Sequence, residues 1–286
     1  MLTESQRVDS ARKQEEPMKL RQMTYERYHD IEATRASELK AIAKSPLHYE
    51  HLRKTPMDAD YLRLGSAVHT AVLEPELFGG EYVIFPGKTR RGKEWDAFQE
   101  EHTNRTILTQ KQMTDALLMA TAVRKHAIAG PLLRSGVPEQ VAEWVDERTG
   151  IECKARVDWL NNCHVSLKTT AETVPYRFNQ QSAKLKYHLT EAFHSDGLFA
   201  VTGERRPVKI IAVESKAPHD VAVYHIPDEV LNYGREIYED ALDLLIQCRA
   251  SGEWPGVCPE EETLTLPVWA TGADGVDWSS VGDLGS

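Results

Sequence analysis

In the second half of this chain, segments with the hydrophobic spacing of β-strands alternate with segments that have the spacing of α-helices. This order limits the folds that the chain can adopt. After Gly136 come three strand-like runs, VAEWVD, ECKARVDWL and HVSLK, separated by ERTG and NN, which are typical of turns. A helical pattern over about 179–198 follows, then the strand-like runs VKIIAVE and VAVYHI, and finally a long helical pattern over about 228–249. We therefore predict a three-stranded meander, a helix, two strands and a helix.

The first half is predicted to be mostly helical. TRASELKAIAKSP, from Thr34, has capping residues, apolar residues at helical spacing and a Ser-Pro stop. A second helix is predicted over 61–73 by an apolar stripe of Leu64, Val68, Ala71 and Val72. A third begins near Thr109 with a capping box to Gln112, and its apolar face is expected to include Met113, Leu117 and Leu118. The order predicts an α/β fold in which helices flank a mixed β-sheet, with an N-terminal helical region.

No linker or internal repeat divides the chain. Residues 1–24 are charged and lack periodicity, so we expect a disordered tail, followed by a single domain over 25–270 and a C-terminal tail over 271–286. With 286 residues, of which 41% are hydrophobic, the chain can bury a substantial core.

The composition excludes several classes of protein. No run of about 18 apolar residues exists, and the N-terminus is polar, so we expect no membrane insertion or export and a cytoplasmic location. The cysteines form no C-x-x-C pair, which argues against a zinc ribbon and favours ordinary thiols. They are Cys153, Cys163, Cys248 and Cys258.

The charge balance, 34 basic against 44 acidic residues, gives a net charge of −10, so any contact with nucleic acid must be local. KTRRGK, from Lys88 to Lys93, is the best candidate, because cations neutralise phosphates and the aromatic residues that follow can stack on bases. A solvated surface loop is the alternative interpretation. The candidate DNA contacts here are Lys88, Arg90, Arg91, Lys93 and Trp95.

The hairpin CKARVDWLNNCHVSLKTTAE resembles a metal-dependent nuclease site that lacks one carboxylate. Asp158 lies near the end of one strand, and Lys168 lies two residues beyond Ser166, on the same strand face. Such a site needs oxygen ligands for a hard divalent cation and a lysine beside the phosphate and water. Ser166 occupies the place of the second acid. From the hairpin alone, a hairpin-end aspartate and a surface lysine remain the alternative.

Several further stretches, spread over roughly residues 30–270, carry a family resemblance. They are ASELKAIAKSPLHY, LRLGSAVHTAVLEP, KTRRGKEWDAF, GIECKARVDWL, LKTTAE, YHLTEAFHSDGL and LTLPVWA. Together they resemble the exonuclease VIII (RecE-type) exonucleases of phage and prophage recombination systems. These are relatives of lambda exonuclease in the PD-(D/E)xK nuclease superfamily.

The resemblance implies a restriction-endonuclease-like PD-(D/E)xK core. It implies an enzyme that uses Mg²⁺, with Mn²⁺ as a substitute, to degrade one strand of linear duplex DNA from its 5′ end. The 3′ overhang would serve a single-strand annealing recombinase partner. The resemblance further implies a ring-shaped homo-oligomer, a trimer or tetramer, in the cytoplasm of a bacterial host and encoded by a phage or prophage.

The resemblance also assigns residues. His69 would join the metal shell, where Gly65 and Ser66, one turn earlier, leave room above its ring, although a structural histidine is the alternative interpretation. The remaining implied site residues are Asp158 as the first metal carboxylate, the Leu167 carbonyl as a further ligand, Lys168 as the catalytic lysine, and Glu139 beside the metal or its water. Implied DNA contacts are Arg35, Ser37, Tyr187, Thr190 and His194.

Three departures from the family converge on this site. Ser166 replaces the acidic residue before x-Lys, Thr190 replaces a glutamine, and His194 replaces a tyrosine. Loss of a carboxylate removes a negative charge from the metal shell, so the sequence predicts weak metal binding and slow or absent cleavage. Ser166→Asp is expected to raise cleavage by orders of magnitude.

Two other functions stay open at this point. One is a catalytically inactive DNA-end-binding or assembly protein of the same fold. The other is an iron–sulfur nuclease of the superfamily, but the spread of the cysteines does not match the cluster-ligand pattern. If Ser166 is aligned wrongly, Glu139 and Glu152 are the next carboxylates to consider.

Overall fold

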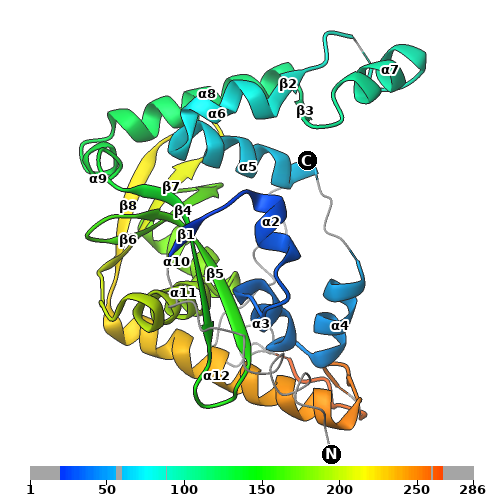
Figure 1. The fold of residues 1–286 in the computed structure, drawn as a ribbon, viewed down its shortest axis with the longest axis vertical. Helices are drawn as coiled ribbons and strands as arrows, with labels where there is room; N and C mark the ends of the chain where they lie inside the picture. Colours follow the sequence, from blue (N-terminus) through cyan, green and yellow to red (C-terminus); the bar gives the residue numbers. More distant parts are fainter. Residues whose placement is uncertain (1–19, 56–59, 88, 259, 267–286) are drawn as a thin grey trace, which may run out of the picture.

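A six-stranded mixed sheet forms the centre of the protein (Figure 1). The computed structural model describes residues 20–266 except 56–59, 88 and 259. In sheet order the strands are β1 (Arg21–Gln22), β4 (Val137–Val145), β5 (Glu152–Leu160), β6 (His164–Thr170), β7 (Val208–Glu214) and β8 (Val221–Ile226). β6 and β7 are parallel and the other neighbouring pairs are antiparallel. The predicted mixed sheet and meander are confirmed.

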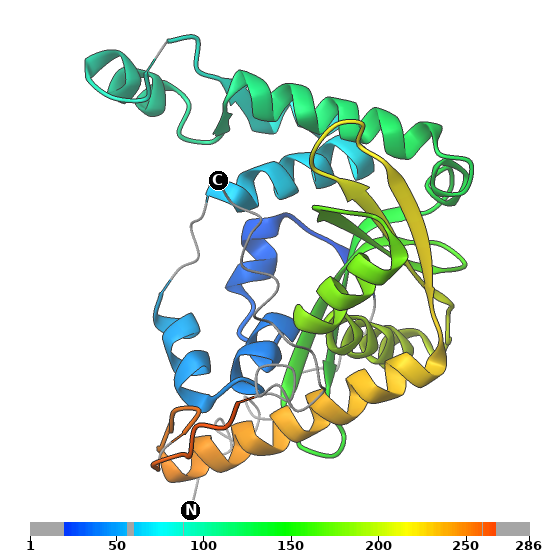
Figure 2. The same cartoon turned by 180° about the vertical axis from the view of Figure 1, so that it is seen from behind.

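Helices cover both faces of the sheet (Figures 1 and 2). One face packs against α3 (Ala36–Ile42), α10 (Pro175–Lys184), α11 (Tyr187–Thr202) and α12 (Asp228–Ser251). The other packs against α5 (Asp60–Leu73), α8 (Gln110–Lys125) and α9 (Ala129–Leu132). The remaining elements are α2 (Tyr25–Asp30), α4 (Pro46–Lys54), α6 (Pro75–Glu81), α7 (Lys93–Glu101) and a parallel pair, β2 (Tyr82–Ile84) and β3 (Thr106–Leu108). No helix in the described part of the chain is long and apolar enough to cross a membrane.

Strand β6 is buried on both faces, but the two faces differ in chemistry. Val165 and Leu167 belong to the core beneath α5 and α8. Because successive side chains of a strand alternate, His164 and Ser166 point the other way, toward α11. Ser166 indeed bonds to a side chain of α11. A polar face of a buried strand therefore meets a helix, and this contact positions the candidate site.

The N-terminal segment differs from the expected tail. Arg21 and Gln22 pair with Val141 and Gln140 of β4, and the Arg21 guanidinium lies 2.6 Å from the Glu143 carboxylate. Leu20 packs against the apolar core. The expectation of a disordered tail is thus corrected for residues 20–24, because β4 would otherwise have an open edge. Residues 1–19 and 271–286 lie outside the described part of the chain.

The helix expected over 179–198 is two helices. α10 is closed by N–H bonds from Leu185 to the Gln181 carbonyl and from Lys186 to the Ala183 carbonyl. Lys186 then adopts a left-handed conformation, with φ of 52°, and α11 begins at Tyr187. The reversal of backbone hand at one residue separates the two helix axes. α11 can therefore pack along β6 independently of α10.

The buried face of α8 is also displaced from the expected one. The capping box of Thr109 and Gln112 is confirmed. Leu117 and Leu118, however, are 47% and 50% exposed, so their assignment to the apolar face was wrong. The buried residues are Ala116, Met119, Ala120 and Val123. Small alanines at the contact let α8 approach its neighbours closely, which leaves the two leucines outside.

Gly234→Ala should destabilise the fold. A Cβ atom at this position of α12 would lie 2.1 Å from the His188 carbonyl oxygen of α11. Such overpacking against backbone is expected to cost about 2–3 kcal/mol, measured by equilibrium denaturant unfolding. Gly79→Ala on α6 is the matched control, because its added Cβ meets nothing within 4 Å and alanine favours a helix. An unchanged unfolding midpoint for Gly234→Ala would contradict the close crossing of α11 and α12.

Candidate active site

The central strands β5 and β6 separate beside their hairpin. They pair only at Trp159 with Val165 and at Leu160 with His164. Beyond these two pairs, β6 remains paired with β7 only and β5 with β4 only. Asp158 and Ser166 are the next residues on the two strands, so they lie where the fork opens.

Asp158 is the centre of a cluster in this fork. Its Oδ2 accepts the Leu167 N–H at 2.7 Å and lies 3.7 Å from Lys168 Nζ. Its Oδ1 lies 4.0 Å from His69 Nδ1 of α5. The side chains of His69, Asp158 and Lys168 are 29%, 16% and 20% exposed. Four residues assigned from sequence therefore come together at a partly open surface.

The Leu167 carbonyl also faces the fork. The His164 N–H donates to the Pro207 carbonyl, and the Thr170 carbonyl accepts the Ser215 N–H, so the main chain at these even-numbered positions faces the β7 side. Main-chain groups of successive strand residues point to opposite edges. The N–H and carbonyl of Leu167 therefore point to the β5 side, where Asp158 already accepts the N–H.

Glu191 of α11 supplies a carboxylate that the sequence reasoning missed. The Ser166 hydroxyl donates to Glu191 Oε2 at 2.6 Å, and Lys168 Nζ lies 3.5 Å from Oε1. The Glu191 side chain is fully buried. β6 has a serine where the family has an acidic residue, but Glu191 of α11 places a carboxylate beside that serine. The expected loss of one negative charge from the site is corrected.

A signal for Glu191 existed in the sequence. In YHLTEAFHSDGL the glutamate stands between the apolar residues Leu189 and Phe193. Leu189, Glu191, Ala192 and Phe193 are all buried on α11. A charged residue on the buried part of a helix is rarely found without a partner. Seeking that partner among the polar residues of β6 would have led to Ser166 and Lys168.

The charges in the fork support one another. Burial would raise the pKa of Glu191, but the neighbouring Lys168 ammonium, together with His164, holds it well below its usual range. Burial likewise opposes ionisation of Asp158, and Lys168 and His69 nevertheless hold its pKa below the ordinary value. Burial would lower the pKa of Lys168, but the two carboxylates raise it above the usual range. Two carboxylates and one ammonium are therefore charged at neutral pH.

The histidine of the cluster is in the form that binds metals. Burial lowers the pKa of His69 from its ordinary value, and the attraction of Asp158 offsets this only in part. The imidazole is therefore neutral at pH 7, and a neutral ring nitrogen can be a metal ligand.

Glu139 lies directly across from Asp158. Pro138 pairs with Trp159 and Gln140 with Val157, which places residue 139 opposite residue 158. Glu139 has a φ of 52°, a left-handed conformation that costs a non-glycine residue about 1–2 kcal/mol. Its carboxylate lies 2.8 Å from the Arg156 guanidinium. Burial, and then repulsion from Asp158, raise the pKa of Glu139 to about 8.

Residues 35–267 match the family model of a PDDEXK-like domain of unknown function (DUF3799). The chain belongs to this family. A crystal structure of a protein named "Putative exonuclease", from Eubacterium rectale, superposes with a TM-score of 0.60 at 15% sequence identity. The likeness covers 92% of this chain and 99% of that chain, and it shows a shared fold. No curated protein matches the sequence significantly. The predicted PD-(D/E)xK core is thereby confirmed.

Two of the DNA contacts expected from sequence line a cleft of the PDDEXK-like domain. Arg35, which caps the N-terminus of α3, and Ser37 of α3 line a cleft of about 1480 Å³ together with Ser66 of α5. Ser66 is about one turn before His69, so the cleft leads toward the candidate active site. Glu152 also lines it, but stands exposed at the far end of β5 from Asp158. Glu152 is therefore a poor substitute for a site carboxylate.

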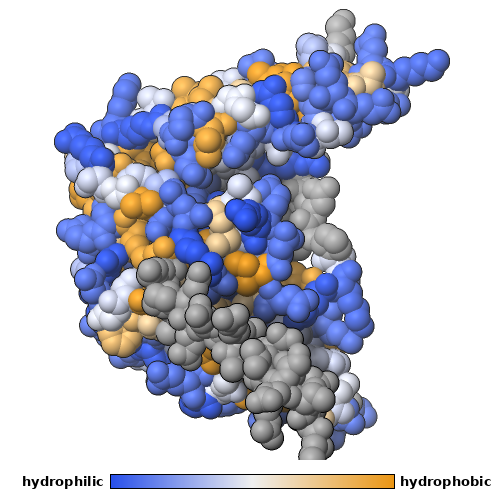
Figure 3. All heavy atoms as spheres, viewed as in Figure 1, coloured by the Kyte–Doolittle hydropathy of each residue, from blue (hydrophilic) through white to orange (hydrophobic). Residues whose placement is uncertain are grey.

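The basic segment lies on an arm of the PDDEXK-like domain (residues 85–105) that carries α7 away from the sheet (Figure 1). Arg90 donates to the Ile107 carbonyl and lies 5.4 Å above the Trp95 ring, which packs edge-on against Phe85. Arg90 and Trp95 thus hold the arm together. Arg91 and Lys93 are exposed, and Figure 3 shows mostly hydrophilic side chains on the arm. Lys88 lies outside the described residues.

The α11 residues assigned to DNA contact have different surroundings. The Tyr187 ring centroid lies 5.7 Å from Lys168 Nζ, so this residue borders the fork. The Thr190 hydroxyl donates to the Lys186 carbonyl at 3.4 Å. His194 lies deeper, with its ring centroid 6.0 Å from that of His164. Tyr187 is the best placed of these to contact a phosphate in the fork.

Proposed function

We propose that this PDDEXK-like protein is a metal-dependent nuclease that degrades linear duplex DNA from its 5′ ends. The arrangement of Asp158, Glu191 and Lys168 in the strand fork is the observation that carries the proposal. A positive side chain held between two ionised carboxylates at a partly open surface is well suited to phosphodiester hydrolysis. The family and the shared fold support a nuclease in general.

The donor set fits a hard divalent cation. Mg²⁺ and its substitute Mn²⁺ prefer oxygen ligands, and Asp158, Glu191 and the Leu167 carbonyl would provide them, with His69 alongside. Glu191 Oε1 is buried and faces the Lys168 ammonium at 3.5 Å without a hydrogen bond, so it retains capacity to bind a cation. When bound, the cation would act as a Lewis acid and lower the pKa of a water molecule.

The protein's own residues would position the phosphate and the water. The Leu167 N–H fixes the Asp158 carboxylate, which in turn holds the Lys168 ammonium. Lys168 would offset the negative charge that develops on the scissile phosphate and orient the attacking water. The Tyr187 ring beside Nζ restricts where the ammonium can move. Arg35 and Ser37 in the cleft would guide a DNA strand toward the fork.

The finer parts of the proposal rest on the sequence resemblance. These are the 5′-to-3′ direction, the 3′ overhang, a single-strand annealing recombinase partner, and action in the cytoplasm of a bacterial host that carries the phage or prophage. The alternative, an inactive DNA-end-binding protein, depended on the carboxylate missing at Ser166. Glu191 supplies a carboxylate beside that serine and favours an active enzyme.

A digestion assay tests the proposal. A 5′-phosphorylated linear duplex, labelled at the 5′ or the 3′ end, is incubated with the protein and Mg²⁺ or Mn²⁺. We expect early release of the 5′ label, late release of the 3′ label, intact circular duplex, and no reaction in EDTA. Binding of DNA ends without cleavage in either metal would instead support the inactive alternative.

Assembly into a ring is a second prediction. Exposed cations such as Arg91 and Lys93 would line a central channel, while acidic surface faces solvent. Light scattering at micromolar concentration should give the mass of a trimer or tetramer of the 32.3 kDa chain. A monomeric mass would refute the closed ring.

A further inference from the structure

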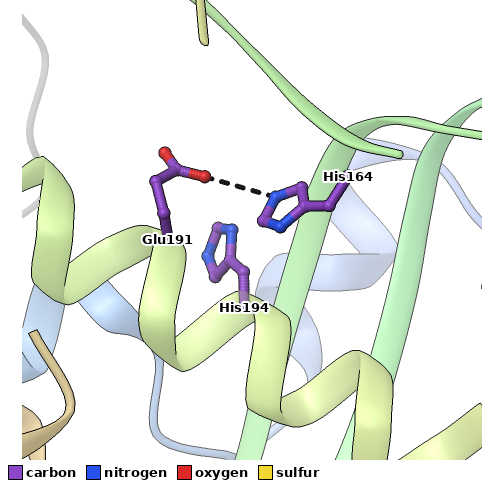
Figure 4. A group of neighbouring side chains, drawn as sticks. All are labelled: His164, Glu191 and His194. Carbon is purple, nitrogen blue, oxygen red and sulfur yellow. Dashed lines mark ion pairs between the residues drawn. The ribbon is translucent and has the colours of Figure 1, made fainter. Parts of the chain in front are cut away.

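A cluster of His164, Glu191 and His194 lies behind the fork (Figure 4). His164 belongs to β6, while Glu191 and His194 stand three residues apart on α11 and therefore share one face. One ligand atom from each residue lies within 4.8 Å of the others. The side chains of His164 and Glu191 are fully buried, and His194 is partly buried. Two imidazoles and a carboxylate thus converge in the protein interior.

Buried polar atoms without partners gather in this cluster. Within the described part of the chain, they include both ring nitrogens of His164 and Nδ1 of His194. His164 Nε2 lies 3.2 Å from Glu191 Oε2, but without the geometry of a hydrogen bond. A buried polar group that makes no hydrogen bond costs about 1–3 kcal/mol. Because one ligand atom of each residue lies close to those of the other two, a single bound ion could satisfy one ring nitrogen of each histidine.

We propose that His164, His194 and Glu191 bind a transition-metal ion, with Zn²⁺ as the best fit. Two imidazole nitrogens and one carboxylate oxygen form a common zinc ligand set, whereas Mg²⁺ prefers oxygen throughout. Bonds of 2.0–2.1 Å in a tetrahedron separate neighbouring ligands by about 3.3 Å. The observed separation of His164 Nε2 from Glu191 Oε2 agrees with this value. A water would complete the tetrahedron, while the Ser166 hydroxyl keeps its hydrogen bond to Oε2.

The zinc site and the proposed nuclease site would share one carboxylate. Glu191 presents Oε1 to Lys168 and Oε2 to His164 and Ser166. The nearby ammonium disfavours a second cation, but Asp158 and Glu191 together carry more negative charge than Lys168 offsets. A bound zinc would fix the orientation of Glu191. The inference goes beyond the proposed function, because zinc binding does not require that the protein cleave DNA.

Zinc titration of the metal-free full-length protein tests this site. Competition with a chromophoric chelator should give one tight equivalent of Zn²⁺, and Co²⁺ in its place should give the strong visible absorption of a tetrahedral centre. We expect His194→Gln to weaken Zn²⁺ binding by on the order of 100-fold or more and to abolish that absorption. His164→Asn should do the same, and circular dichroism shows whether each variant is folded.

Two variants separate this site from other ligands. Cys258→Ser removes an exposed thiol that could bind zinc, and should leave the tight equivalent unchanged. His69→Ala alters the proposed nuclease site without removing a charge and should retain zinc within about threefold, so failure of either proposal can be recognised separately. Absence of tight Zn²⁺ binding by the wild-type protein, or unchanged binding by folded His194→Gln, would overturn the inference.

Discussion

Asp158→Ala should abolish metal-dependent DNA cleavage, with a loss of about 10³-fold or more in the single-turnover rate. Asp158 accepts the Leu167 N–H, pairs with Lys168 and lies 4.0 Å from His69. The variant removes one of two carboxylates that would hold the cation and also leaves the lysine without one of its partners. His69→Ala should be milder, because the neutral imidazole contributes no charge.

Calorimetry with Mn²⁺ checks the cause of this loss. Asp158→Ala should lose Mn²⁺ binding at the nuclease site, and unchanged affinity would contradict the assignment of Asp158 as a ligand. Asp228→Ala is the control, because Asp228 is exposed at the start of α12. It changes the net charge equally and should leave both the rate and the affinity unchanged.

Ser166→Asp should lower cleavage by about tenfold or more, opposite to the gain expected from sequence alone. The Ser166 hydroxyl lies 2.6 Å from Glu191 Oε2, so a carboxylate at position 166 would stand against a buried carboxylate. Two unit charges 4 Å apart repel by about 4 kcal/mol at the effective dielectric of a protein. One acid would then be protonated, or both would shift away from Lys168.

The double variant Ser166→Asp/Glu191→Gln tests whether Glu191 on α11 takes the role of the acidic residue that the family has at position 166. Glu191→Gln alone should reduce cleavage by about 10²–10³-fold. The double variant keeps two carboxylates in the fork and should recover most of the rate, which makes the two substitutions strongly non-additive. A large gain of activity in Ser166→Asp alone would show that Glu191 is not the second acid. DNA binding, followed by fluorescence anisotropy, should change little in each variant.

The sequence predicted the local parts of the site better than its long-range parts. The spacing of Ser166 and Lys168 places both on one face of β6, and both do contact Glu191. Their meeting with Asp158 follows from a hairpin pattern that is local in sequence. Glu191 is 25 residues from Ser166, and its position depends on how α11 packs on the sheet. The hydrophobic periodicity of the sequence does not show how α11 packs on the sheet.

The errors in the fold have a related origin. In α8, leucines are more hydrophobic than alanines, so a stripe through Leu117 and Leu118 looked more favourable than one through Ala116 and Ala120. In the structure the alanines are buried instead, because small side chains let α8 pack closely against its neighbours. β1 was missed because two residues cannot display a period. β1 forms because β4 has an open edge for it to pair with, and the residues of the N-terminal segment carry no information about that edge.

The left-handed Lys186 sets the angular phase of α11. Each residue of an α-helix turns the next by about 100°, so the break determines the direction in which every later side chain points. With α11 starting at Tyr187, Glu191 faces Ser166 and His194 faces His164. A helix that ran on unbroken from α10 would present other residues to β6. The turn between α10 and α11 therefore determines whether the Glu191 carboxylate faces β6. An insertion or deletion in this turn would rotate Glu191 away from Ser166.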